Sequence, residues 1–133
     1  MADSKSKGDI GEAMVLVDAL KSGYKVAQPI GEDWPYDLII LRKGKLERVQ
    51  CKYTKSNGEV IIVKCRSTNN WVDRKYTEDD LDWIAVYDAT TDKCYYIPSS
   101  ELKEGRATIN LRLKPAKNGQ KAGIKMATDY LDW

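Results

Sequence analysis

Apolar and polar residues alternate along this chain with two different periods, and the first period predicts a helix. Between residues 9 and 21, apolar side chains recur at three- and four-residue spacing until Ser22 and Gly23 end the pattern. Glu12 lies beside that stripe, where a carboxylate is costly unless it is paired. An exposed Glu favoured by the helix dipole is the alternative explanation. The side chains that we expect to face the core are Ile10, Ala13, Met14, Val17 and Leu20.

The second period, of two residues, predicts strands. Two short apolar runs at residues 35–41 and 47–53 are bounded by turn residues, and the short link between them allows a hairpin with Gly44 at its tip. If the two strands pair antiparallel, Asp37 on the first strand lies beside the triplet 50–52 on the second. The hairpin then gathers one carboxylate, one amide and one ammonium group, from Asp37, Gln50 and Lys52.

Alternation also predicts which way the strand side chains point. The odd-numbered residues of 49–53 are apolar and should face a core, whereas Gln50 and Lys52 should line a polar surface. An ordinary solvent-exposed sheet face is the alternative explanation of that surface. In the following strand, residues 59–66, the same alternation turns Lys64 and Arg66 toward the polar side of the triplet, where they are placed to hold phosphate.

The rest of the chain predicts additional strands, at residues 24–28, 83–87, 94–97 and 107–113. The stretch 67–76, which contains Trp71 and Arg74, is expected to be a loop. A capping box at residues 77–80 predicts a short helical turn, and residues 124–133 predict a short terminal helix.

Composition narrows the possible classes of protein. With 133 residues, 42% of them apolar and 32% charged, the chain should form one globular domain spanning residues 1–133. No apolar run approaches the length of a membrane span and the N-terminus is polar, so we expect a cytoplasmic protein. The three Cys residues should be reduced thiols. The absence of His excludes a His general base and His-activated nucleophiles, and leaves a zinc site poorly supported.

The groups gathered by the predicted hairpin suit the hydrolysis of a phosphodiester. A hard divalent cation such as Mg²⁺ prefers oxygen ligands, which Asp37 supplies. The scissile phosphate becomes more negative in its transition state, and the ammonium group of Lys52 places positive charge there. The pattern is therefore typical of a magnesium-dependent phosphodiesterase site.

These residues and their order resemble the PD-(D/E)XK nuclease superfamily. Residues 35–37, Pro-Tyr-Asp, stand where that family has Pro-Asp, and Gln50-x-Lys52 stands where it usually has an acid, any residue and Lys. Residues 8–12, Gly-Asp-Ile-Gly-Glu, are similar to the helical Glu of the branch that contains Holliday junction resolvases and group I intron-encoded homing endonucleases. A Gln in the acid position looks more like the intron-encoded group. With the expected downstream strands, the resemblance covers roughly residues 8–98.

The resemblance implies a fold and a role for each residue. The fold is α/β with a restriction-endonuclease-like core, in which an N-terminal helix precedes a mixed central sheet in the order αβββαβ, with an added C-terminal strand and helix. Asp37 would be the main metal ligand, joined by Glu12 directly or through water and by the backbone carbonyl of Cys51. Gln50 would orient the attacking water, and Lys52 would stabilise the phosphate. Mg²⁺, or Mn²⁺ in its place, is the expected cofactor.

The function that this resemblance implies is a magnesium-dependent, site-specific endonuclease of homing type, which hydrolyses phosphodiester bonds of double-stranded DNA. A Holliday junction resolvase-like nuclease is the alternative enzyme. A catalytically inactive DNA-binding or assembly module is the alternative from another class, because a family member that has lost its activity could also carry Gln in place of the acid. Since one small domain offers one scissile site, cutting both strands implies a homodimer or a homotetramer.

A basic C-terminal extension, residues 105–133, is expected to contact DNA phosphate. As far as residue 128 it holds six basic residues and no acidic one, although a solvated tail would show the same charge. The late apolar and aromatic residues are candidates either for subunit contact or for docking onto the chain's own core: Ile124, Met126, Tyr130, Leu131 and Trp133. The residues expected to contact DNA are Lys64, Arg66, Arg74, Arg112, Lys114, Lys117, Lys121 and Lys125.

Overall fold

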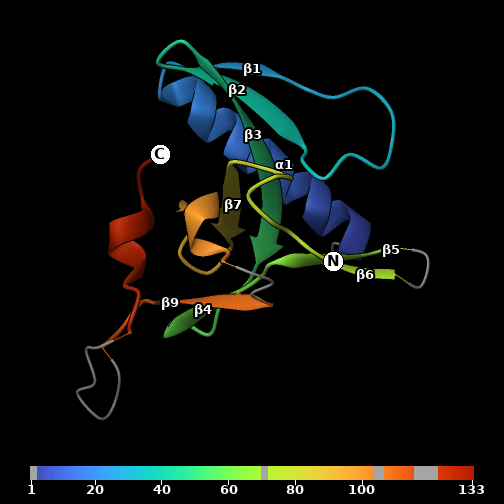
Figure 1. Cartoon of the computed structure of the whole chain (residues 1–133). Coiled ribbons are helices and arrows are strands. Elements are labelled where there is room, and N and C mark those ends of the chain that lie inside the picture. The colour runs from blue at the N-terminus through green and yellow to red at the C-terminus, as the bar shows by residue number, and fades with distance from the viewer. Residues whose placement is uncertain (1–2, 70–71, 104–106, 116–122) are drawn as a thin grey trace.

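The computed structural model describes residues 3–69, 72–103, 107–115 and 123–133 of the chain (Figure 1). A long helix, α1 (Ser4–Lys21), precedes a series of strands, and none of the described helices is long and apolar enough to cross a membrane. The strands are β1 (Lys25–Ala27), β2 (Leu38–Arg42), β3 (Lys45–Thr54), β4 (Val60–Lys64), β5 (Arg66–Asn69), β6 (Val72–Lys75), β7 (Trp83–Asp88), β8 (Lys93–Pro98) and β9 (Thr108–Arg112). Two short 3-10 helices are η1 (Ser99–Glu101) and η2 (Ala127–Tyr130).

The central sheet has the strand order β1-β2-β3-β7-β8. Its neighbouring strands pair antiparallel except β3 and β7, which run parallel with Val49 opposite Trp83 and Thr54 opposite Asp88. The helix α1 packs against the central strands of this sheet (Figure 1). The predicted α/β class, an N-terminal helix followed by a mixed sheet, is therefore confirmed.

The connection between β3 and β7 differs from the expected order, in which a helix precedes the parallel strand. β4 leaves the central sheet and pairs antiparallel with β9, and the stretch expected to be a loop contains the β5–β6 hairpin. Residues 78–80 form a turn rather than a helix. The Asp80 carboxylate closes that turn by accepting a hydrogen bond from the Thr77 N–H, so the polar pattern that resembles a helix cap serves a single turn.

The buried face of α1 is not the one that apolar periodicity predicts. Gly11, Val15 and Ala19 are buried at four-residue spacing. A Cβ atom on Gly11 would lie 3.1 Å from the Lys52 carbonyl oxygen, so the small residue lets the helix backbone approach β3 closely. Larger side chains on this face would hold the helix away, and they lie on its flanks instead. Those exposed on the predicted face are Ile10 (41%), Val17 (44%) and Leu20 (55%).

Two apolar clusters fill the two faces of the central sheet. Val49 and Cys51 belong to the cluster under α1, which also holds Leu38, Ile40 and Tyr96. Successive side chains of a strand alternate between faces, so the side chains on either side of Cys51 point the other way, as predicted. The cluster on that other face packs the central sheet against the antiparallel pair β4–β9, called the ribbon below. The ribbon residues in this cluster are Ile61, Val63, Ile109 and Leu111.

The C-terminal aromatic residues dock onto the chain's own core. Trp133 stacks on Tyr96 with ring centroids 3.9 Å apart, and it meets Trp83 edge to face at 5.9 Å. The Tyr130 hydroxyl donates to Glu101 at 2.7 Å. Of the two expectations for these side chains, packing within the chain is the one that the structure shows, and the expected terminal helix is shortened to η2.

Candidate active site

A tight hairpin between β2 and β3 sets the position of Asp37. The two-residue loop consists of Lys43 and Gly44, with φ of 52° and 76°. Positive values at both positions match the twist of the flanking strands, which is why this loop needs Gly. The register pairs Leu38 with Val49, and the Asp37 N–H extends the ladder by donating to the Val49 carbonyl at 2.8 Å. The predicted hairpin is thus confirmed.

The carboxylate of Asp37 is held through one of its two oxygen atoms. Oδ2 accepts from the Cys51 N–H at 2.9 Å and from the Gln50 side-chain amide at 3.0 Å. Within the described part of the chain, Oδ1 accepts no hydrogen bond. Burial raises the pKa of Asp37 above its ordinary value, although the Cys51 N–H and the charge of Lys52 oppose the shift. A buried anion with so few donors is a place where a cation would be stabilised.

The Gln50 amide joins the two oxygen atoms that the sequence predicts as metal ligands. Its Nε2 donates to Asp37 Oδ2 at 3.0 Å and to the Cys51 carbonyl oxygen at 3.3 Å. Since one donor reaches both, the two oxygens converge on a single point. Carboxylate and carbonyl oxygens are the donor set that Mg²⁺ prefers, so these residues fit the metal. Among the described residues no three acidic or thiol side chains cluster tightly enough to bind a metal, so a carbonyl and water would complete the coordination.

Lys52 extends from the same face of β3 as Gln50. Its Nζ donates to the Arg66 carbonyl at 3.2 Å and lies 5.2 Å from the centroid of the Tyr76 ring. Burial lowers the pKa of Lys52, and the negative charge of Asp37 opposes the shift. A carbonyl and an aromatic ring orient the ammonium group without neutralising it, so its charge is available to a phosphate.

Glu12 and Asp37 line the same hollow, of about 260 Å³. Burial is the main cause that raises the pKa of Glu12, followed by the charges of Asp37 and Asp9, while a hydrogen bond from Gln28 at 3.2 Å opposes them. The close packing of Gly11 on β3 is what brings α1, and with it Glu12, to this end of the sheet. A cation bound between the two carboxylates would relieve the repulsion between them.

Three residues of this site escape the sequence-based prediction. Glu32 and Asp33 line the same hollow from the loop before β2, and Asp33 has a φ of 68°. Two acids directly after Gly31, just upstream of Asp37, are the signal in the sequence that could have found them. The third residue is Gly11, whose role depends on a contact between α1 and β3 that no local pattern announces.

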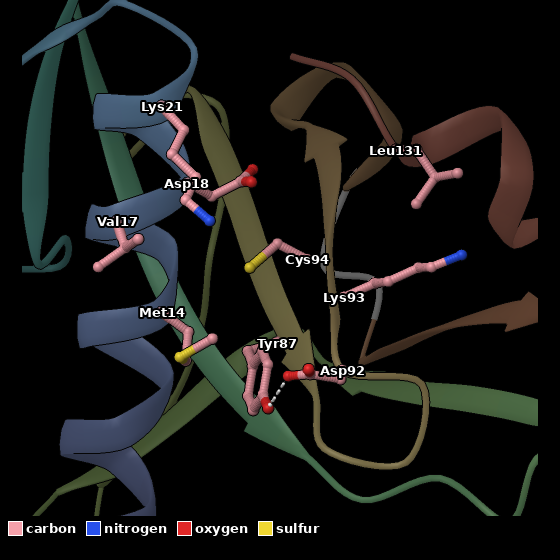
Figure 2. A pocket seen from close by; sticks show the side chains of 9 residues that line it. All are labelled: Met14, Val17, Asp18, Lys21, Tyr87, Asp92, Lys93, Cys94 and Leu131. Atoms are coloured by element: carbon pink, nitrogen blue, oxygen red, sulfur yellow. Dashed lines mark hydrogen bonds between the residues drawn. The ribbon is translucent and has the colours of Figure 1, made fainter.

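A second hollow of about 280 Å³ lies between α1, β8 and the residues around Leu131 (Figure 2). The Tyr87 hydroxyl donates to Asp92 at 2.6 Å, and the Tyr96 hydroxyl donates to Asp18. Both acids therefore have partners, and two lysines balance them. The hollow matches the first in size but not in charge, and its groups do not converge on a point. Its charged lining residues are Asp18, Lys21, Asp92 and Lys93.

Two of the residues predicted to contact DNA from the middle of the chain, Lys64 and Arg66, lie close to the site. Lys64, the last residue of β4, and Arg66, the first of β5, are both exposed. Arg74 belongs to β6 rather than to a loop. Lys117 and Lys121 lie outside the described residues.

In the C-terminal extension, two of the predicted cations already bind other groups. The Arg112 guanidinium donates to the carbonyls of Lys114 at 3.0 Å and Pro115 at 3.2 Å. Lys125 forms an ion pair with Glu101 at 2.8 Å. The exposed Lys114 has no such pairing in the described part of the chain.

Comparison with known proteins shows which family and which solved structure this chain is similar to. A family model described as PD-(D/E)XK endonuclease matches residues 2–132. The solved structure of a bacterial homing endonuclease, I-Ssp6803I, is similar with a TM-score of 0.72 and 26% sequence identity, over 97% of this chain and 88% of that one. No curated protein matches the chain significantly.

Proposed function

Because the chain belongs to the PD-(D/E)XK endonuclease family, we propose that it is a magnesium-dependent endonuclease that cuts double-stranded DNA at specific sites. One observation carries the proposal. Asp37 Oδ2 and the Cys51 carbonyl oxygen converge on the Gln50 amide, and Lys52 extends from the same face of β3 as Gln50. An acid, an oxygen ligand and a cation so placed form a phosphodiesterase site.

Asp37 and the Cys51 carbonyl would hold the metal, and Glu12 would join them through water. When bound, a divalent cation offsets the charge of the phosphate oxygens and lowers the pKa of water. The raised pKa values of Asp37 and Glu12 support this assignment, because a cation would stabilise both charged forms. Mg²⁺ and Mn²⁺ share the preference for these oxygen donors.

Gln50 and Lys52 have separate roles in the proposed reaction. The Gln50 amide donates to both oxygens that would hold the metal. With these oxygens on a metal, the Gln50 side chain would instead present its carbonyl oxygen to water. Lys52 would place positive charge beside the scissile phosphate. Replacing Lys52 by Met should therefore abolish turnover while the protein still binds DNA.

Site-specific cleavage of the homing type is the activity that we propose, in keeping with the similarity to a bacterial homing endonuclease. The test is incubation with a randomised linear duplex library and, separately, with four-way junctions, each with Mg²⁺ or with EDTA, followed by sequencing of the ends. Defined cuts in linear DNA that need Mg²⁺ are expected. Cleavage of junctions alone would make the protein a resolvase, and DNA binding without any cleavage would make it an inactive module.

Self-association completes the proposal, since each chain offers one site and duplex DNA has two strands. With Trp133 and Tyr130 packed on the chain's own core, the exposed apolar side chains of α1, such as Val17 and Leu20, are the better candidates for subunit contact. Leu20→Glu should reduce the assembly mass in light scattering. Leu46→Glu, a matched change on the exposed β2–β3 hairpin, should not. A strict monomer with and without DNA would contradict self-association.

A further inference from the structure

The outer face of the ribbon presents a row of side chains suited to base recognition. We propose that this face enters the major groove and reads an A·T base pair beside the scissile phosphate, with Asn110 and Ile62 as the reading side chains. The inference rests on the proposed function, because it assigns the sequence preference of the same DNA cleavage.

The ribbon is anchored on one side and open on the other. Ile61, Ile109 and Leu111 are 0% exposed, so the inner face is fixed to the core. The outer face alternates with it: Ile62 pairs with Asn110, and Lys64 pairs with Thr108. A rigid two-stranded antiparallel pair with a free polar face has the form of a β-ribbon that B-DNA admits in its major groove, which is about 12 Å wide.

The central pair of this face fits one kind of base pair. An Asn side chain can bond to N6 and N7 of adenine at once, and an apolar side chain can contact the methyl group of thymine. Asn110 is exposed, and Ile62 is 55% exposed although it is apolar. Residues paired across antiparallel strands lie about 5 Å apart, so both can meet the same or the adjacent base pair.

The position of the ribbon ties this recognition to the active site. β4 ends at Lys64, and Arg66, two residues further, provides the carbonyl that holds Lys52 Nζ. The end of the reading face therefore lies two residues from the carbonyl that holds the proposed catalytic lysine. This short connection fixes the distance between the recognised base pair and the cut.

Arg112 marks the far end of the ribbon and does not share this role. Its guanidinium donates to the carbonyls of Lys114 and Pro115, and so it braces the chain that leaves β9. The residues left to contact the groove are therefore Ile62, Lys64, Thr108 and Asn110.

The experiment compares cleavage profiles of the wild type and Asn110→Ala on a randomised duplex library in Mg²⁺. A lost bidentate contact should reduce the preference for A·T at one position roughly 5- to 100-fold and leave the other positions unchanged. Ile62→Ala should reduce it at the same or the adjacent position by a smaller factor. Lys93→Ala, which changes an exposed residue of the second hollow, is the matched control and should leave the profile intact.

A profile that is unchanged in Asn110→Ala would overturn base reading by the ribbon, and so would a uniform loss of affinity for every sequence, which marks a phosphate contact or a protein-binding surface. The library is also selected by binding without metal, so that the ribbon is tested even if nothing is cleaved. A wild type that selects sequences but never cuts would overturn the proposed function and leave the ribbon inference standing.

Discussion

Asp37 and Asp88 lie at strand ends on either side of β3, yet their surroundings are opposite. Both oxygens of Asp88 accept hydrogen bonds, chiefly from Ser56 and Thr91, and the residue is 0% exposed. Burial alone would raise the pKa of Asp88, but these donors outweigh it and the pKa is lowered. Around Asp37 burial prevails, and the pKa is raised.

The difference separates a carboxylate whose charge the fold satisfies from the one that we propose as a metal ligand. A buried anion stabilises a protein only when enough donors replace the water that it has lost. Asp88 has them on both oxygens, whereas Asp37 accepts through Oδ2 alone. The incomplete set of partners, and not depth of burial, distinguishes the residue that we assign to the metal.

The largest effect should follow from Asp37→Asn. Loss of a residue that only supports a metal ligand typically costs about 10–100-fold in metal affinity or activity, so loss of the ligand charge should slow cleavage more than about 100-fold. DNA binding should stay equal or tighten, because a carboxylate beside a phosphate repels it. Single-turnover cleavage in Mg²⁺ and a binding titration measure the two. A variant that cuts as fast as the wild type would refute the site assignment.

Asp88→Asn should show the reverse behaviour. It replaces hydrogen bonds to a charged acceptor, so the free energy of unfolding should fall by about 2 kcal/mol. Cleavage below the unfolding temperature should remain near the wild-type rate. Denaturant titration gives the stability, with Asp92→Asn as control, since Asn tolerates the φ of 55° there and still accepts from Tyr87. Equal stability of both variants would contradict the structural role of Asp88.

Gln50→Glu sharpens the comparison of Asp37 with Asp88. It removes the amide that donates to Asp37 and adds a negative charge beside it. We expect Mg²⁺ to bind at least about tenfold more tightly, because two carboxylates then face one cation. Without metal the variant should be less stable than Gln50→Ala, which removes the donor without adding charge. Calorimetric titration and thermal unfolding with and without Mg²⁺ measure both effects. Unchanged metal affinity would place the cation away from Gln50.

Gly11→Ala tests the packing that carries Glu12 to Asp37. The added Cβ would lie 3.1 Å from the Lys52 carbonyl oxygen, and overpacking of this kind typically costs about 1–3 kcal/mol. Displacement of Glu12 should weaken metal binding by about tenfold, the low end of the loss that is typical for a residue supporting a metal ligand. Gly8→Ala is the control, because a Cβ there meets nothing within 4 Å and should stabilise the helix by up to about 1 kcal/mol. Identical metal titrations for the two variants would remove Gly11 from the site.

The smallest effect concerns pH. Because the pKa of Asp37 is higher in the folded than in the unfolded protein, its protonated form adds to the free energy of unfolding. This contribution is fully present below the pKa of the unfolded protein, near 3.8, and is lost as pH rises through the pKa of the folded protein. The advantage of Asp37→Asn over wild type should therefore grow as pH rises above 3.8. The lowered pKa of Asp88 gives the opposite sign: the deficit of Asp88→Asn should shrink as pH falls below 3.8. The measurement is metal-free unfolding between pH 3 and 7. If the two acids were equivalent, the stability differences of both variants from the wild type would change with pH in the same direction.

The hairpin that carries Asp37 and Gln50 was predictable because its determinants are local. Gly44 at the tip sets the turn, the turn sets the register, and alternation then assigns the face of every side chain. Lys52 follows from the same alternation. Each of these predictions needed only neighbouring residues.

The remaining parts depend on contacts between distant segments. Apolar periodicity shows that α1 has an apolar stripe. Gly11 and Val15 face the sheet, however, because a small residue lets the helix approach β3 closely, and periodicity carries no information on this distance. The pairing of β4 with β9 joins segments far apart in the chain and removes β4 from the central sheet. Glu32 and Asp33 reach the site only through the path of an irregular loop.

The parallel pairing of β3 with β7 has a consequence for the order of folding. The β2–β3 and β7–β8 hairpins close between neighbours, whereas the β3–β7 ladder must first close a long connection, a slower step. Asp37 and Gln50 belong to the early hairpin, but Arg66 and Tyr76, which orient Lys52, belong to the connection. We therefore expect a growing chain to have the Asp37 carboxylate in place before Lys52 is oriented, so that the proposed site is complete only when the two hairpins have docked.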